Sequence, residues 1–157
     1  FRMDSIIRVG NEKDIPRALE LIKELAAFEK APSEVVVSIE EMINWGFGKE
    51  KLFEFFVLEK QARILGIALY YYKYSTWKGK CLFLEDIIVT EHERSKGYGK
   101  RLFEEVIKVA KAQKVRRMEW QVLDWNIHAI KFYNRYKSKL DGEWINCKLD
   151  YNQLQSW

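Results

Sequence analysis

The spacing of apolar residues changes after Val89, and this change constrains the fold more than any other feature of the sequence. Before it, residues 53–59, 64–74 and 80–89 are rich in aromatic and β-branched side chains and are separated by short polar or glycine-containing turns. Such segments predict a meander of antiparallel strands. After it, apolar residues recur at helical spacing, which predicts an amphipathic helix beginning near Gly97. The apolar face of that helix consists of Leu102, Phe103, Val106, Ile107 and Ala110.

The residues before the meander predict further elements of a mixed α/β fold. Residues 5–9 predict a short strand, and the apolar spacing of residues 16–30 predicts a helix. Ser38 and Glu41 match the S-x-x-E capping box, in which each side chain satisfies a free backbone donor of the other residue. A second short helix is therefore expected to start there and to end near residues 46–48.

The residues after the long helix continue the alternation of elements. Residues 117–122 predict a strand, residues 126–136 a helix and residues 142–150 a closing strand. The chain contains no internal repeat, low-complexity tract or linker rich in Pro, Gly and Ser. A single domain spanning residues 1–157 is therefore expected.

The composition argues against several classes of protein. The chain has 157 residues, of which 48% are hydrophobic and 32% are charged, as in ordinary soluble globular proteins. It has no run of about 18 apolar residues, so no membrane partner is expected. The net charge of +4 is too small by itself to favour a nucleic-acid partner. The basic clusters and the nine Phe, eight Tyr and six Trp residues leave a nucleic-acid-binding module as an alternative.

The cysteines and histidines predict neither a metal site nor redox chemistry. Cys81 and Cys147 lie far apart, and together with His92 and His128 they show no metal-ligand spacing. The first residues, Phe1 to Asp4, lack the basic and apolar regions of a secretory signal. A cytoplasmic location is therefore expected.

The stretch from Glu91 to Arg101 carries the clearest chemical signal. It lies between a predicted strand and a predicted helix, and four of the eight residues 94–101 are basic. Free amide groups and the helix dipole attract anions at a helix N-terminus, and Gly97 and Gly99 let a ligand approach the backbone closely. The stretch is neither a Walker A loop nor a complete G-x-G-x-x-G motif. It predicts a pyrophosphate site, and the alternative is a tight turn before a solvated helix.

This stretch and its surroundings resemble the GNAT superfamily of acetyl-CoA-dependent N-acetyltransferases, whose R/Q-x-x-G-x-G/A signature matches Arg94 to Gly99. Within the superfamily, the chain is similar to the spermidine/spermine (diamine) N-acetyltransferases and their thialysine-acetylating relatives. The resemblance implies a mostly antiparallel central sheet flanked by helices, with an acetyl-CoA cleft. It extends over nearly the whole chain, through residues 24–29, 46–48, 71–72, 74–79, 84–86, 125–126 and 132–133.

The resemblance assigns acetyl-CoA contacts to three segments. The first would offer backbone groups to the pantetheine arm and the acetyl carbonyl, and contains Ile87, Ile88 and Val89. The second would cradle the pyrophosphate, and contains Arg94, Ser95, Lys96, Gly97, Tyr98, Gly99 and Lys100. The third would complete the cofactor cleft, and contains Asn126, Ile127, His128 and Ala129.

The resemblance also implies catalytic and acceptor residues. Tyr133 would donate a proton to the departing thiolate, and Glu85 would serve as the base, through water. A polyamine or diamine is the expected acceptor, a thialysine or lysine-like amino acid is the alternative, and a homodimer is expected. The acceptor site would be bordered by Phe28, Glu29, Trp77, Glu85, Asp86, Glu119, Trp120, Gln121 and Trp144.

Elementary chemistry supports both catalytic assignments. A lysine-like amine with a pKa of about 10.4 is about 3.4 units too basic to be neutral at pH 7, which costs about 4.6 kcal/mol. A carboxylate on a strand beside the cofactor, such as Glu85, can accept that proton. Asn126 and Tyr133 lie seven residues apart and share a helix face. The alternative to these catalytic assignments is that Glu85 is an ordinary ion-paired carboxylate and that Tyr133 is a core tyrosine.

Two departures from the family pattern affect these assignments. Lys137 and Ser138 stand where relatives usually have Gly-Ala, close to the end of the last predicted helix. Ser75 replaces an acidic residue of the polyamine acetylases and matches the thialysine-type relatives instead. A catalytically silent acetyl-CoA sensor and a protein-lysine acetylase are further alternatives, although Trp77 and Trp144 indicate a cleft that encloses a small acceptor.

Overall fold

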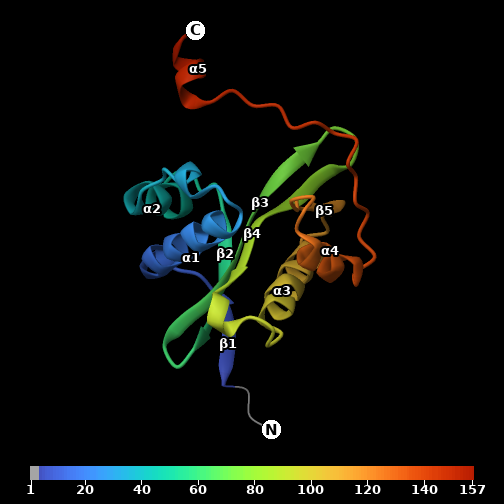
Figure 1. Ribbon diagram of the computed structural model, residues 1–157. Helices are drawn as coiled ribbons and strands as arrows, with labels where there is room; N and C mark the ends of the chain where they lie inside the picture. The colour runs from blue at the N-terminus through green and yellow to red at the C-terminus, as the bar shows by residue number, and fades with distance from the viewer. Residues whose placement is uncertain (1–3) are drawn as a thin grey trace. The chain divides into compact units, whose positions relative to one another are not determined.

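The computed structural model describes residues 4–157 (Figure 1). The chain forms two compact units, one up to Gln121 and one comprising Val122–Trp157. The expectation that a secretory signal is missing rests mostly on residues 1–3. These residues lie outside the described residues. Within residues 4–157, no helix combines the length and the apolar character that crossing a membrane requires.

The first unit is built on one five-stranded sheet. Its strands follow the chain in the order β1-β2-β3-β4-β5, and β1 to β4 are antiparallel while β5 runs parallel to β4. The predicted meander is therefore confirmed. β5 is shorter than residues 117–122 because only three of its residues pair with β4. The strands are β1 (Ser5–Val9), β2 (Glu54–Lys60), β3 (Arg63–Ser75), β4 (Gly79–Val89) and β5 (Arg117–Glu119).

Three helices flank this sheet. α1 (Ile15–Phe28) and α2 (Ile39–Phe47) lie on one side, and α3 (Tyr98–Ala112) lies on the other (Figure 1). The capping box before α2 is confirmed, because the Ser38 hydroxyl accepts from the Glu41 N–H and the Glu41 carboxylate accepts from the Ser38 N–H. Short 3₁₀ turns at Glu12–Asp14, Pro32–Glu34 and Glu91–Glu93 connect the elements.

Both faces of the sheet are buried by these helices. The amphipathic face predicted for α3 is confirmed, because Leu102, Phe103 and Val106 are almost fully buried. On the α1 side, alternate residues of the strands enter the core, as the period of a strand requires. The core of that side contains Ile15, Ala18, Leu19, Leu21, Met42, Phe55, Val57, Ile67, Leu69 and Ile88.

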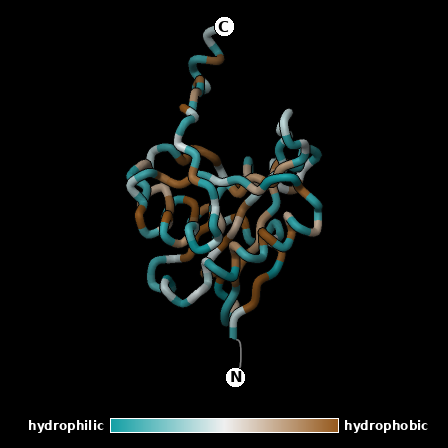
Figure 2. Tube along the Cα trace, turned by 90° about the vertical axis from the view of Figure 1, so that its right-hand side faces the viewer, coloured by the Kyte–Doolittle hydropathy of each residue, from teal (hydrophilic) through white to brown (hydrophobic). Residues whose placement is uncertain are grey.

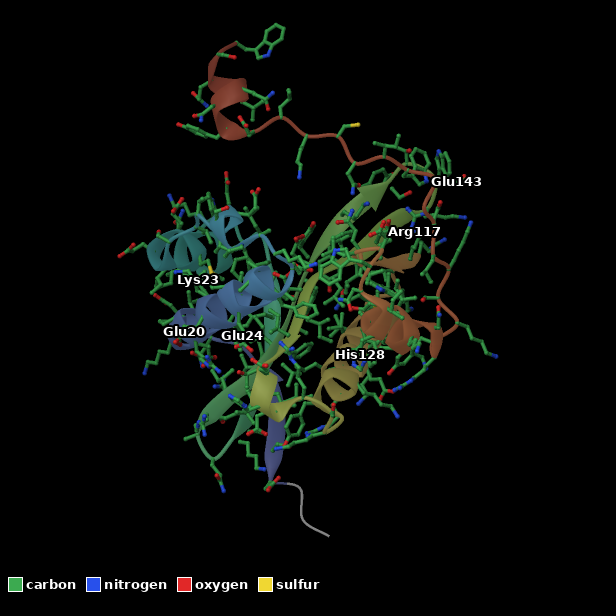
Figure 3. All side chains as sticks on the ribbon, viewed as in Figure 1. Glu20, Lys23, Glu24, Arg117, His128 and Glu143 are labelled. Carbon is green, nitrogen blue, oxygen red and sulfur yellow. The ribbon has the colours of Figure 1, made fainter. Side chains whose placement is uncertain are left out.

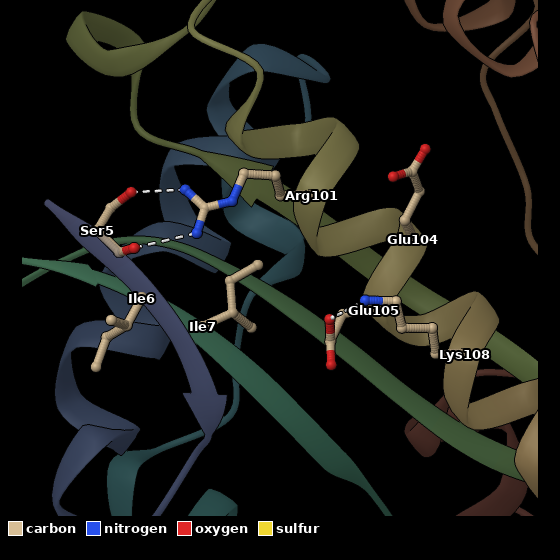
Figure 4. Close-up of a pocket in the computed structure, with 7 residues that line it drawn as sticks. All are labelled: Ser5, Ile6, Ile7, Arg101, Glu104, Glu105 and Lys108. Carbon is tan, nitrogen blue, oxygen red and sulfur yellow. Dashed lines mark hydrogen bonds and ion pairs between the residues drawn. The ribbon is translucent and has the colours of Figure 1, made fainter. Parts of the chain in front are cut away.

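Polar contacts attach the edge strand β1 to the helices. Arg8 forms an ion pair with Asp14 at 2.7 Å, which lowers the pKa of that buried carboxyl. Arg101 on α3 donates to the hydroxyl and the carbonyl of Ser5, at 2.6 and 3.1 Å (Figure 4). The contact borders a shallow cavity of about 380 Å³ that contains none of the predicted site residues. Its lining is Ser5, Ile6, Ile7, Arg101, Glu104, Glu105 and Lys108.

The second unit contains α4 (Ile127–Asn134) and α5 (Tyr151–Gln155). The strand predicted at residues 142–150 was wrong, since none of those residues pairs with another strand in the described sheet. Apolar and polar residues alternate along this segment (Figure 2), but a strand also needs a neighbour for its backbone groups. Trp144 and Ile145 are 71% and 87% exposed.

Candidate active site

The glycine-containing loop ends at the N-terminus of α3, a helix of 15 residues. Gly97 is the N-cap residue, with φ of +81°, and no side chain caps the helix there. Only glycine adopts this left-handed conformation without steric cost. A Cβ built on Gly97 meets nothing within 4 Å, so the dihedral angle, and not crowding, requires the glycine. The arrangement leaves the first amide groups of α3 available to an anion.

The Arg94 side chain connects the loop to β4 and α1. Its Nε donates to the Val89 carbonyl at 3.0 Å, and its guanidinium lies 3.7 Å from Glu24 and over the Phe28 ring at 5.6 Å. On the same loop, Lys96 forms a 2.6 Å ion pair with Glu93. In this structure, Arg94 therefore stabilises the loop, and its predicted contact with the pyrophosphate remains a prediction.

Glu24 is a site residue that the sequence analysis did not identify. Figure 3 shows it on α1, where Glu20 and Lys23 are also labelled. Its carboxylate accepts from the Thr90 hydroxyl at 3.1 Å and from the Glu91 N–H at 2.8 Å. Glu24 thus holds the turn between β4 and the glycine loop. In the sequence, Glu24 lies in segment 24–29 of the family resemblance, and its spacing of four residues from Phe28 places both on one helix face.

A bulge in β4 determines where Glu85 lies. Leu69 pairs with Asp86, whereas the next residue of β3, Tyr70, pairs with Leu84. Glu85 is therefore the extra residue of the bulge, and the strict alternation of side chains is interrupted there. The Glu85 carboxylate accepts a hydrogen bond from the Tyr71 hydroxyl at 3.1 Å. Tyr71 is a second contact that the sequence analysis did not identify.

Three of the predicted acceptor residues form one acidic cluster. Burial, followed by the charges of Glu85 and Glu29, raises the pKa of Asp86 to about 7. Burial also raises the pKa of Glu29, at the C-terminal end of α1. Mutual repulsion and partial burial disfavour three negative charges in this space. A bound cation relieves this repulsion, so the cluster suits a protonated amine.

One edge of β4 is open beside this cluster. β4 pairs with β3 as far as Val89, but β5 pairs only with residues 81–83. Within the described sheet, no strand covers the edge of β4 from Leu84 onward. Ile87, Ile88 and Val89 lie on this part of the strand, where backbone groups could pair with an extended ligand.

Other predicted acceptor residues are engaged elsewhere. The Glu119 carboxylate lies 3.5 Å from Lys73 and 3.2 Å from Nε of Arg117, which Figure 3 places on β5. Trp120 packs edge-on against Phe103 of α3 at 5.2 Å. Two cations neutralise Glu119, so it is poorly suited to bind an amine.

The turn between β3 and β4 contains Trp77, which is 79% exposed. The Ser75 hydroxyl accepts from the backbone N–H groups of Trp77 and Lys78, each at 3.2 Å. Ser75 therefore stabilises this turn. Gln121 is exposed at the end of the first unit, and Trp144 lies in the second unit.

In the second unit, Asn126 and Tyr133 belong to the same helix. Asn126 is the N-cap of α4, and its Oδ1 accepts from the Ala129 N–H at 3.2 Å. Tyr133 is buried. Lys137 adopts φ of +56°, and the Ser138 hydroxyl donates to the Tyr133 carbonyl at 3.1 Å. Lys137 and Ser138, which stand where relatives usually have Gly-Ala, thus stabilise the chain at the end of α4. Ile127 and His128 are exposed in its first turn.

No group of three or more His, Cys, Asp and Glu residues suited to a metal ion occurs within residues 4–157. A carboxylate cluster next to an open strand edge, and an uncapped helix N-terminus on a glycine loop, together suit transfer of an acyl group to an amine.

Comparisons with known proteins agree with this chemistry. The acetyltransferase (GNAT) family model matches residues 18–137. Thialysine N-epsilon-acetyltransferase of Bos taurus is 35% identical over 136 residues, which cover 82% of this chain and 80% of that protein. Human spermidine/spermine N(1)-acetyltransferase-like protein 1 is 31% identical over 134 residues, which cover 81% of this chain and 19% of that protein.

The fold is also found among solved structures. Aminoglycoside N-acetyltransferase AAC(6')-Iy in complex with CoA superposes with a TM-score of 0.73 at 17% identity, covering 92% of this chain and 94% of that one. At this identity, the likeness is one of fold. The family match extends from α1 through the glycine loop to Lys137, and so includes the loop, the acidic cluster and α4. The chain therefore belongs to the acetyltransferase (GNAT) family and is an acetyl-CoA-dependent N-acetyltransferase.

Proposed function

We propose that this enzyme acetylates a primary amine of a small diamine or polyamine. The observation that carries the proposal is the acidic cluster of Glu29, Glu85 and Asp86, in which burial and like charge raise the pKa of Asp86 to about 7. A second ammonium group of the acceptor would pair with these carboxylates and compensate for the solvation that they lose on burial. Thialysine or a lysine-like amino acid is the alternative acceptor, and the names of the relatives include both classes.

The base in this proposal is Glu85. An acceptor amine must lose its proton before its nitrogen can attack the acetyl carbonyl, and a carboxylate within reach, directly or through a water molecule, can take that proton. Glu85 is exposed at the bulge of β4, next to the open strand edge. Its position supports this role because solvent and substrate can reach its carboxylate.

The cofactor contacts are proposed along the same strand and loop. Backbone groups of residues 87–89 would pair with the pantetheine arm, and residues 94–100 would hold the pyrophosphate. The uncapped N-terminus of α3 supports the second contact, since its amide groups and dipole favour an anion. Acetyl-CoA supplies the acetyl group and a thiol leaving group of pKa near 8.5.

Tyr133 is proposed as the proton donor to that leaving group. A tyrosine hydroxyl, with an ordinary pKa of about 10, can donate a hydrogen bond or a proton to a thiolate at little cost. Residues 126–129, at the start of the same helix, would complete the cofactor cleft. In this proposal both units contribute to one functional domain, residues 1–157.

The acceptor is tested by a screen that measures acetyl-CoA-dependent release of free thiol. The panel contains diamines, polyamines, thialysine, lysine, aminoglycosides and a neutral amine. We expect the highest kcat/KM for a diamine or polyamine, and a loss of about tenfold or more for that acceptor in Glu29→Gln. Glu12→Gln is the matched control, because Glu12 lies outside the cluster. Activity only on neutral amines would contradict the proposal, and acetyl-CoA binding without turnover would indicate the silent sensor.

The proposal includes a homodimer in the cytoplasm, with no membrane or nucleic-acid partner. Ile145, Cys147 and Leu149 alternate with polar residues, and Ile145 and Leu149 are 87% and 57% exposed. A second copy could provide the neighbouring strand that this segment lacks. Light scattering on the full chain and on a chain ending at Asp141 tests this: the full chain should be dimeric and the shortened chain monomeric. A monomeric full chain would contradict the homodimer.

A further inference from the structure

We propose that Tyr71 is a positioning residue for acetyl transfer, whose hydroxyl holds the Glu85 carboxylate in place. The hydroxyl oxygen of Tyr71 lies 3.1 Å from Oε1 of Glu85. The inference rests on the proposed role of Glu85 as the base. It adds a residue from the neighbouring strand that would determine how well that base works.

The backbone pairing explains why the two side chains meet. Tyr71 pairs with Phe83, and the bulge at Glu85 breaks the alternation two residues further along β4. Leu69, two residues before Tyr71, belongs to the core on the α1 side, so Tyr71 lies on the same face. Glu29 at the end of α1 also approaches from this face, since its charge affects Asp86.

Packing restrains the Tyr71 ring independently of its hydrogen bond to the carboxylate. It stacks on Phe83 with 5.4 Å between ring centroids and 29° between planes. Lys73 lies over the Phe83 ring at 5.6 Å and restrains it further. A side chain already fixed by packing loses little more freedom when its hydroxyl makes a hydrogen bond. The contact is therefore more effective than one made by a mobile surface side chain.

The charges around Glu85 explain why it needs a donor. Tyr71 donates to it from β3, Asp86 is its neighbour in the chain, and the charges of Glu85 and of Glu29 from α1 both act on Asp86. The Tyr71 hydroxyl fixes the direction of the Glu85 carboxylate, which ionised acids cannot do because they only accept hydrogen bonds. Burial and the neighbouring Glu85 raise the pKa of Tyr71 to about 12. Tyr71 thus remains a donor throughout the neutral pH range.

The test compares Tyr71→Phe, which keeps the stacked ring, with Tyr72→Phe. Tyr72 is the adjacent residue and lies on the opposite face of β3. Tyr72→Phe therefore also removes a tyrosine hydroxyl, but one that does not contact Glu85. We expect Tyr71→Phe to lower kcat about tenfold, because a hydrogen bond to a charged group contributes about that factor. The loss should grow as the pH falls, and acetyl-CoA affinity should change by less than about twofold. Tyr72→Phe should match the wild type.

A double variant shows whether Tyr71 acts through Glu85. In the Glu85→Gln background, Tyr71→Phe should cause no further loss of kcat, because the two changes remove one interaction. A further loss of full size, or a wild-type kcat in the single Tyr71→Phe variant, would overturn the inference and leave the role of Glu85 intact. A wild-type kcat in Glu85→Gln across pH would overturn the role of Glu85 and this inference with it. Thermal denaturation of each variant checks that it is folded.

Discussion

The carboxylate of Glu24 accepts a 2.8 Å hydrogen bond from the backbone N–H of Glu91, 67 residues further along the chain. It also lies 3.7 Å from the guanidinium of Arg94. α1 and the loop before α3 are thereby joined at one side chain. Since α1 ends beside the acidic cluster and the loop leads to the proposed cofactor site, Glu24 links the two halves of the site in the first unit.

Glu24→Gln should therefore weaken acetyl-CoA binding indirectly, through the loop before Gly97. The amide loses the charge that attracts Arg94 and one of its acceptor oxygens, so the loop before Gly97 becomes less ordered. We expect a three- to tenfold weaker affinity by calorimetry and a loss of about 1 kcal/mol in unfolding free energy. The control is Glu20→Gln, one turn earlier, whose side chain is 67% exposed. Equal behaviour of both variants would show that Glu24 does not organise the loop.

Gly97→Val should weaken acetyl-CoA binding by about tenfold or more. The residue has φ of +81°, which costs other residues about 1–2 kcal/mol, and a β-branched side chain more. The added side chain also points into space that is open for a ligand. Calorimetry on the folded variant measures the affinity. Gly142→Val, at an open position without positive φ, is the control. Unchanged affinity in Gly97→Val would mean that the loop is only a turn.

Tyr133→Phe should lower kcat by about 10- to 10⁴-fold and leave acetyl-CoA affinity nearly unchanged. A proton donor to the leaving thiolate strengthens its contact only as charge develops on sulfur, so the ground state is little affected. A pH-rate profile with calorimetry on the same sample measures both quantities. Tyr136→Phe, three residues further on and less buried, is the matched control. Wild-type kcat across pH would remove Tyr133 from the chemistry.

Glu85→Gln should depress the rate most at low pH, where the acceptor amine carries its proton and a base is needed. Raising the pH should recover part of the loss, because more of the amine is already neutral. The measurement is kcat/KM across the pH range for the preferred acceptor. Glu54→Gln, which removes a carboxylate that is bound by the Tyr70 hydroxyl, provides the control. A defect independent of pH would reassign Glu85 from base to substrate positioning.

Asp86 should make stability depend on pH. Burial raises its pKa from 3.8 to about 7 in the folded state, so between these values the folded chain binds more protons than the unfolded chain. The free energy of unfolding contributed by this group is therefore lost as the pH rises from about 4 to 7. The Asp86→Asn variant should not show this loss, and its free energy of unfolding at pH 8 should exceed that of the wild type by about 2–4 kcal/mol. Urea unfolding at pH 5 and pH 8 measures it, with exposed Asp124→Asn as the control.

The parts of the fold that were predictable depend on neighbouring residues in the chain. The spacing of Leu102, Phe103 and Val106 alone indicates which face of α3 is buried, and Ser38 with Glu41 marks the start of α2. The strand expected at residues 142–150 fails for the opposite reason. Alternation shows only that a segment could be a strand, whereas pairing requires a neighbour that sequence spacing cannot identify.

The site divides in the same way. The glycine loop is recognisable from the sequence because a helix start is a local feature. The roles expected of Glu85 and Tyr133 follow from the family resemblance and stay predictions. Whether a charged side chain is available is not local. Glu119 and Glu85 both lie on strands, yet Lys73 and Arg117 neutralise the first, while the bulge places the second beside Tyr71 and Asp86.

The sequence alone thus specifies the order of elements in the first unit and the chemical type of the site, because periodicity and capping act over a few residues. Tertiary folding decides which groups surround each carboxylate. Glu24 meets Glu91, and Glu85 meets Tyr71, only when the sheet and α1 are assembled. The pKa of Asp86 likewise depends on burial and on charges from two elements, which no local pattern contains.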